Sequence, residues 1–324
     1  MIVKKLINTK VEGNIEITER EIKEVSKEDE KKIIDFVQDI IDDDGKLRTS
    51  FWALGAATGR FTSSGPNLQN APKSQADYIP VNIRNAFVAD KNHVLFDLDY
   101  SQIELRLAAS FSKEPVWIRA FESGQSPHIA TAIEMFGKKH TEDEYKKSKN
   151  MKFGIIYGQT AYAFALLYAI SESAAQKFID KWLGALPTLV KWIDNEKSKA
   201  RKLGIAYTYF GRSRPLRTSE FGDTINSDVR HIVEHWERIA VNFIIQGTAA
   251  DIMKMAIVKC YKTIIEQKLK VQMILTVHDE LLFHVHKSHI KKARKLLTEA
   301  MIIEIPGFIP LEVDMKMGQS WGTC

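Results

Sequence analysis

The alternation of apolar and polar residues in the middle of the chain predicts a strand that turns into a helix at an acidic residue. The run Val94–Phe96 consists of strand formers, and Leu98 continues it past Asp97. The apolar positions that follow fit a buried helix with Ser101 as its N-cap. We therefore expect Asp99 at the junction, with its carboxylate facing solvent or a ligand; a helix-capping acid is the alternative.

A second pattern near the C-terminus predicts a hairpin. Two strand-forming runs flank His278–Glu280, so we expect the two acids at a tight turn. His278 and the three histidines that follow it, His284, His286 and His289, could be taken for a metal-binding cluster. Against this, His284 and His286 share one strand face that is expected to be solvated, and no cysteine lies near them or near His289.

The first 45 residues are densely charged and predict one amphipathic helix. Ser26 and Asp29 have the spacing of a capping box, and the isoleucines after them lie on one face. Gly45 is expected to end this helix. We expect it to pack against the main body and to carry no chemistry.

A helical segment in the middle of the chain carries a cation and two aromatic rings along one stripe. Lys149, Phe153 and Tyr157 are spaced i, i+4, i+8. This stripe suits a nucleoside triphosphate; a core-facing aromatic stripe with a solvated lysine is the ordinary alternative. Gly154 and Gly158 would each cost the helix about 1 kcal/mol relative to alanine, which indicates a close approach to the backbone.

Forked hydrogen-bond donors gather in two segments. Residues 58–70 form a turn-rich loop that could lie along a nucleic-acid minor groove, where acceptors occur at every base pair; a solvated loop is the alternative. The helix that begins near Asp228 repeats these residue types at i, i+4, i+8, and a hairpin over 204–217 places basic residues at its tip, for phosphates or for solvent. The donors are Arg60, Asn67, Gln69, Asn70, Arg238, Asn242 and Gln246.

Composition narrows the class of protein. A chain of 324 residues that is 44% hydrophobic can bury a large core, as one large domain or two to three interleaved lobes. The net charge of +5 permits a polyanionic partner. Only Cys260 and Cys324 are present, which excludes a disulfide framework or a cysteine zinc site and favours a reducing, cytoplasmic location. No uncharged stretch approaches the roughly 20 residues of a membrane span.

Three of these stretches together resemble the family A DNA polymerases, the group of bacterial DNA polymerase I. Residues 99–106 look like the family's motif A, 149–158 like motif B and His278–Glu280 like motif C. Residues 58–70 and 238–251 are similar to the segments that precede motifs A and C. The similarity runs from about Lys46 to the C-terminus.

The resemblance implies an α+β right-hand fold with an antiparallel-sheet palm and a helical fingers subdomain. The palm would comprise residues 46–105 and 235–324, and the fingers residues 106–234. Residues 1–45 would be a vestigial segment in place of the thumb, with no room for a proofreading exonuclease domain.

The activity that the resemblance implies is template-directed DNA synthesis on a primer 3′-hydroxyl with two Mg²⁺ ions, for which Mn²⁺ can substitute. The partners would be primer-template DNA, deoxynucleoside triphosphates and a thumb or processivity factor from another chain, with no membrane. Alternatives are a polymerase with reverse transcriptase activity and a non-catalytic nucleic-acid-binding fragment of a larger replication protein.

Residue roles follow by the same resemblance. Asp99 and Asp279 would be metal ligands together with the Tyr100 carbonyl, with Glu280 in support. Lys149 would bind the triphosphate and protonate the leaving pyrophosphate, and Glu104 would exclude a ribose 2′-hydroxyl. The nucleotide site would comprise Gln102, Ile103, Glu104, Lys149, Phe153, Tyr157 and His278; the DNA contacts would be Arg60, Asn67, Gln69, Asn70, Arg238, Asn242, Gln246 and His278.

One position departs from the family pattern. The family usually has an arginine four residues before the motif B lysine, and this chain has Tyr145. Lys146 and Lys147 are the nearest cations, but an ammonium lacks the bidentate fork of a guanidinium.

Overall fold

The computed structural model describes residues 41–71, 82–139, 141–142, 144–146, 148–149, 160–217 and 224–324. The predicted N-terminal helix with Ser26 and Asp29 lies outside the described residues, and so do Lys147, Phe153, Gly154, Tyr157 and Gly158. At the start of the described part, Ile41 forms an antiparallel bridge with Leu47 around a turn.

The chain divides into two compact units. The first consists of Met1–Ser101, Ile252–Ile303 and Glu312–Cys324, and the second of Gln102–Asp251 and Glu304–Leu311. The predicted boundaries at 105 and 235 differ from these divisions. The assignment of palm and fingers remains a prediction.

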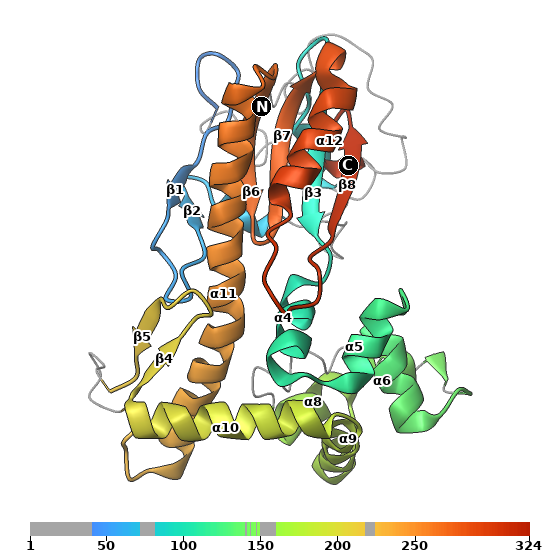
Figure 1. Ribbon diagram of the computed structural model, residues 1–324, viewed down its shortest axis with the longest axis vertical. Coiled ribbons are helices and arrows are strands. Elements are labelled where there is room, and N and C mark those ends of the chain that lie inside the picture. The colour runs from blue at the N-terminus through green and yellow to red at the C-terminus, as the bar shows by residue number, and fades with distance from the viewer. Residues whose placement is uncertain are drawn as a thin grey trace, which may run out of the picture. The chain divides into compact units, whose positions relative to one another are not determined.

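A four-stranded antiparallel sheet forms the centre of the first unit. Its strand order is β6 (Val271–Val277), β7 (Glu280–His286), β3 (His93–Tyr100) and β8 (Val313–Gly318). The strand predicted from Val94–Phe96 is confirmed, and the hairpin predicted around His278 is formed by β6 and β7. Figure 1 shows these strands side by side. The antiparallel sheet with separate helices agrees with the predicted α+β class.

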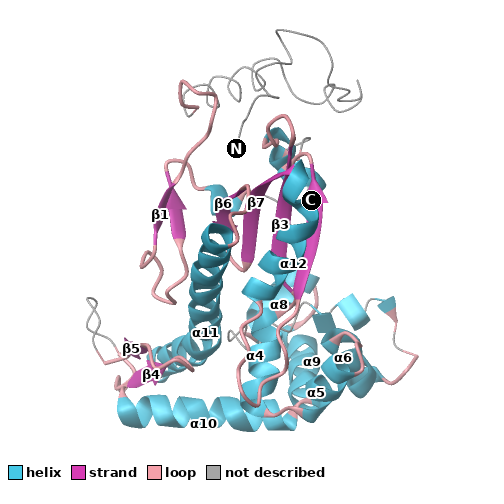
Figure 2. Ribbon diagram, turned by 45° about the horizontal axis from the view of Figure 1, so that its top comes forward, coloured by secondary structure: helices cyan, strands magenta, loops and turns pink. Residues whose placement is uncertain are grey.

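The two faces of the sheet bury different residues because side chains alternate along a strand. On one face, Tyr100 donates its hydroxyl hydrogen to the carbonyl oxygen of Met301, in the helix α12 (Ile290–Met301) that crosses the sheet in Figures 1 and 2. Burial raises the pKa of this hydroxyl. On the same side, burial raises the pKa of the Cys260 thiol to about 12, so Cys260 stays protonated in the core at neutral pH.

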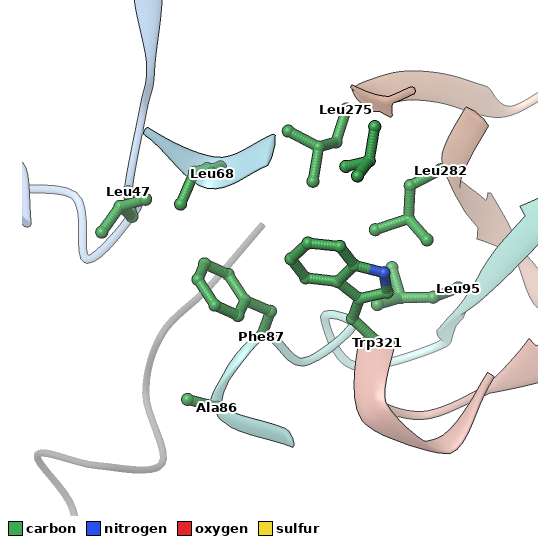
Figure 3. Close-up of a cluster of buried hydrophobic side chains, with 9 residues drawn as sticks. Leu47, Leu68, Ala86, Phe87, Leu95, Leu275, Leu282 and Trp321 are labelled. Carbon is green, nitrogen blue, oxygen red and sulfur yellow. The ribbon is translucent and has the colours of Figure 1, made fainter. Parts of the chain in front are cut away.

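The opposite face carries an apolar cluster around Trp321. Figure 3 shows its indole ring between Phe87 and the leucines of the sheet, and the Phe87 and Trp321 ring centroids are 5.5 Å apart, edge to face. Leu95 and Leu282 belong to this cluster, so Asp97 and Asp99, two and four positions after Leu95, lie on the same face of β3. The smaller elements of this unit are β1 (Ser50–Trp52), β2 (Thr62–Ser64), η1 (Leu68–Asn70), η2 (Ile83–Ala86), η3 (Lys287–His289) and η4 (Trp321–Thr323).

The second unit is mostly helical, as Figure 2 shows. Its one described hairpin is formed by β4 (Ile205–Tyr207) and β5 (Ser213–Pro215), where the sequence predicts it. The helices are α4 (Ile103–Ser112), α5 (Pro115–Glu122), α6 (Pro127–Phe136), α8 (Ala161–Tyr168), α9 (Glu172–Ala185), α10 (Pro187–Leu203) and the first part of α11 (Arg230–Glu266).

A single buried carboxylate joins two of these helices. Glu114 is 0% exposed. Its Oε1 accepts a hydrogen bond from the Val116 amide in α5 (3.1 Å), and its Oε2 accepts from the Thr188 and Leu189 amides at the start of α10 (3.1 Å each). Helix N-termini carry unpaired amides and a partial positive charge, so one anion satisfies both ends.

The helix predicted to begin near Asp228 is α11, which starts at Arg230 and continues through Gly247 to Glu266. A Cβ at position 247 would lie 2.7 Å from Cγ2 of Thr208, so the β4–β5 hairpin requires glycine there. Among the described helices only α11 is long and apolar enough to span a membrane. Because 61% of its apolar window is buried within the protein, it fits a core helix equally well.

Candidate active site

The end of β3 presents one accessible carboxylate. Every residue from Val94 to Tyr100 is buried except Asp99, which is half-buried. The predicted N-cap at Ser101 is wrong, because the Ser101 amide bonds the Glu312 carbonyl oxygen (2.9 Å) and continues the strand pairing. Gln102 precedes the helix instead, in a left-handed conformation (φ 54°) and without a side-chain cap. Asp99 therefore lies in β3, three positions before the N-cap residue of α4.

The turn between β6 and β7 consists of His278 and Asp279. Val277 pairs with Glu280, so the loop has only these two residues. His278 adopts φ 54°, a region that residues other than glycine seldom enter. Asp279 lies in the turn as predicted, whereas Glu280 is the first residue of β7 and not part of the turn.

Strand pairing brings the two motifs together. Asp99 is the cross-strand partner of Glu280, and the Tyr100 amide donates a hydrogen bond to the Asp279 carbonyl oxygen (3.2 Å). On its other side Asp99 pairs with Asp314 of β8. The backbones of Asp99 and Asp279 thus lie close together at one end of the sheet. No group of three His, Cys, Asp or Glu side chains in the described part of the chain is placed to hold a metal ion.

Glu280 is held by two donors on one oxygen. Its Oε1 accepts hydrogen bonds from Nη1 of Arg84 (3.2 Å) and Nε1 of Trp321 (2.9 Å). The Arg84 and Glu280 side chains are 6% and 3% exposed. Glu280 is therefore a buried, ion-paired residue beneath the turn.

The residues predicted to bind nucleotide and described in the second unit differ in exposure. Ile103 is 1% exposed, so its side chain belongs to the core of that unit. Glu104 lies half-buried in the first turn of α4. Gln102 has a buried Oε1 atom without a hydrogen-bond partner among the described residues, and Lys149 is exposed.

Two of the polar residues in the loop after β2 anchor that loop. Asn67 accepts hydrogen bonds from the Ser63 hydroxyl (2.8 Å) and the Gln69 amide (3.1 Å). Gln69 is buried, and its Nε2 donates to the Thr276 carbonyl oxygen of β6 (3.3 Å). Arg60 is half-buried and Asn70 is exposed.

The polar stripe on α11 has the geometry that its spacing predicts. Between Ala240 and Ala250 only Asn242 and Gln246 are not buried, and Arg238 one turn earlier is also half-buried. Oδ1 of Asn242 is buried without a hydrogen-bond partner in the described part of the chain. The half-buried amide side chains of Asn242 and Gln246 offer hydrogen-bond donors along this face.

Basic residues of the β4–β5 hairpin form contacts within the protein. Arg212 donates to Oδ1 of Asp251 (2.7 Å) and to the Gly247 carbonyl oxygen (3.0 Å), both in α11. Burial lowers the pKa of Arg214, whose guanidinium lies 5.9 Å from the Phe243 ring centroid. Both arginines thus contact α11, which the sequence pattern did not indicate.

The histidines near the other end of the sheet differ from prediction. His284 is buried, not solvated: its ring stacks on His93 with 4.1 Å between centroids, and its Nε2 accepts a hydrogen bond from the Asp90 amide (3.1 Å). Burial and then the neighbouring His93 lower the pKa of His284 to about 4. His284 is therefore a buried residue of the sheet and not part of a solvated face.

Two residues of the site have no local signal in the sequence. Arg84 and Trp321 reach Glu280 from segments far away along the chain, and neither lies in a periodic pattern that points to a carboxylate. Their role becomes visible only in the folded structure, where both donate to Glu280.

Comparison with known proteins shows which family the chain resembles in sequence. The sequence model described as DNA polymerase family A matches residues 5–323. A thermostable DNA polymerase I of Thermus thermophilus is 38% identical over 280 residues, which is 86% of this chain and 32% of that protein. The DNA polymerase I of Chloroflexus aurantiacus is 36% identical over 293 residues, covering 89% of this chain and 30% of that protein. The chain thus spans about a third of the length of these curated relatives.

A solved structure resembles the fold as well. The POL domain of Pol1 from M. smegmatis, in complex with DNA primer-template and dNTP, matches with a TM-score of 0.82 and 32% sequence identity. The match covers 92% of this chain and 52% of that one.

Proposed function

Because the chain belongs to DNA polymerase family A, we propose that it is a template-directed DNA polymerase that adds deoxynucleotides to a primer 3′-hydroxyl. The observation that carries the proposal is that the backbones of Asp99 and Asp279 lie close together at one end of the sheet, where the Tyr100 amide donates a hydrogen bond to the Asp279 carbonyl oxygen.

The oxygen ligands available at this end of the sheet fit magnesium. Asp99, Asp279 and the Tyr100 carbonyl offer only hard oxygen ligands, and Mg²⁺ prefers one or two carboxylates while keeping several waters. Mn²⁺ accepts the same ligands. Two ions held by these residues would stabilise the charge on the entering and leaving oxygens of phosphoryl transfer.

Other side chains would bind the triphosphate and select the sugar. Lys149, which is exposed, would bind the triphosphate and deliver a proton to the departing pyrophosphate. Glu104 lies in the first turn of α4, just after the strand that ends with Asp99 and Tyr100, and would exclude the ribose 2′-hydroxyl. Phe153 and Tyr157 would line the nucleotide site, with Gln102 and His278 beside it. Ile103 would contribute through its backbone, because its side chain is buried.

Contacts with primer-template DNA are proposed for the donors that the structure leaves at least partly accessible. Asn242 and Gln246 are the half-buried positions in a buried stretch of α11, and their side-chain amides offer donors there. Arg238, Arg60 and Asn70 would join them. Asn67 and Gln69 would act chiefly by holding their loop, since each already bonds within the protein.

Extension of a labelled primer tests this function. We expect template-dependent products with the four deoxynucleoside triphosphates and Mg²⁺ on a DNA template, and none after chelation of the metal. Binding of primer-template DNA without any extension would contradict the proposal and would favour a nucleic-acid-binding fragment.

A further inference from the structure

Arg84 lies in η2, outside the three motifs, and joins four segments of the first unit. Its guanidinium carbon lies 4.0 Å from the centroid of the Trp321 ring. Its Nε and Nη2 donate to the Ala71 carbonyl oxygen (3.1 and 2.9 Å), and its Nη1 donates to Oε1 of Glu280 (3.2 Å). The charge is almost fully buried, so its geometry is set by these contacts.

Glu280 connects this arginine with both candidate metal ligands. It follows Asp279 directly in the chain and pairs across the strands with Asp99. Its Oε1 accepts from Arg84 and Trp321 together, which fixes the first residue of β7. The nearby turn residue His278 has the left-handed backbone conformation, which persists only when the surrounding structure holds it.

We propose that Arg84 is a positioning residue for the metal site: through Glu280 it sets where the His278-Asp279 turn stands relative to Asp99. The inference rests on the proposed function, because it assumes that Asp99 and Asp279 bind the ions. Partners that orient metal ligands typically change metal affinity 10–100-fold when they are removed.

The fork of the guanidinium is required for this role. Arg84 uses one nitrogen for Glu280 and two others for Ala71, whereas a lysine offers a single ammonium. We therefore expect Arg84→Lys to keep part of the effect and Arg84→Gln to lose it.

Mn²⁺ binding to the purified chain, followed by electron paramagnetic resonance without nucleotide or DNA, separates this role from a stability effect. For Arg84→Gln we expect Mn²⁺ affinity to fall about tenfold or more in protein that circular dichroism shows to be folded, with Arg84→Lys intermediate. Arg201→Gln, which breaks a more exposed arginine–glutamate ion pair with Glu237 in the second unit, is the control and should leave Mn²⁺ affinity unchanged.

A double variant tests the route through Glu280. If Arg84 acts through Glu280, then Arg84→Gln combined with Glu280→Gln weakens Mn²⁺ binding no more than the stronger single variant. Additive losses, or a lower melting temperature with unchanged Mn²⁺ affinity, would overturn the inference while leaving the proposed function intact. Absence of Mn²⁺ binding and primer extension in the unmodified chain would contradict both.

Discussion

The Tyr100 amide donates a hydrogen bond to the Asp279 carbonyl oxygen over 3.2 Å, and this contact joins the end of β3 to the turn before β7. The position of Asp99 relative to Asp279 is therefore set by strand register. A slip of one residue between β3 and β7 would move Asp99 to the opposite face of the sheet. The buried pairs between β3 and β7, such as Phe96 with Phe283 and Leu98 with Leu281, protect this register.

Replacement of Glu104 tests sugar selection. We expect Glu104→Ala to raise the use of ribonucleoside relative to deoxyribonucleoside triphosphates about tenfold or more, because the space for a 2′-hydroxyl opens. The measurement is kcat/KM for matched triphosphates in single-nucleotide incorporation. Glu134→Ala, at an exposed position of α6, is the control. An unchanged ratio for Glu104→Ala would remove Glu104 from the sugar contact.

The sequence predicts the strand–helix junction at Asp99, the hairpin at His278 and the polar stripe of α11, because each depends on local periodicity or turn length. It does not predict the N-cap at Gln102, since the pairing of Ser101 with Glu312 is a long-range contact. The buried environments of Glu280 and His284 were missed for the same reason. A charged or polar residue becomes a core residue only when distant segments supply its partners, as Arg84 does for Glu280.

Glu114 is expected to be important for the stability of the helical unit. Glu114→Ala would leave three helix-terminal amides without their acceptor, at a cost of roughly 2–4 kcal/mol in the free energy of unfolding. Ser126→Ala is a suitable control because the Ser126 hydroxyl accepts only one such bond, from His128, and its loss should cost about 1 kcal/mol. Denaturant unfolding measures both. Equal costs would show that Glu114 does not stabilise two helices.

His284 predicts a pH dependence of stability. Its folded pKa is lowered to about 4 from 6.5, so between these values the unfolded chain binds a proton that the folded chain does not. The free energy of unfolding should therefore decrease as the pH falls from about 6.5 to about 4, by up to about 3 kcal/mol.

Urea unfolding at several pH values measures this pH dependence of the free energy of unfolding. The variant is His284→Gln, and the control is His235→Gln, which changes an exposed histidine of α11. We expect the first variant to reduce the slope between pH 4.5 and 6.5 and the second to retain it. The same slope in both variants would assign the pH dependence to other groups.

Primer extension by Asp99→Ala, Asp279→Ala and Asp314→Asn tests the central claim most directly. Asp314 is the cross-strand neighbour of Asp99 on β8 but has no proposed part in the chemistry, so it controls for the loss of a carboxylate at this position of the sheet. We predict that either alanine variant loses roughly 10³-fold or more in rate while Asp314→Asn stays within a few-fold of the unmodified chain. Near-normal extension by Asp99→Ala or Asp279→Ala would contradict the account.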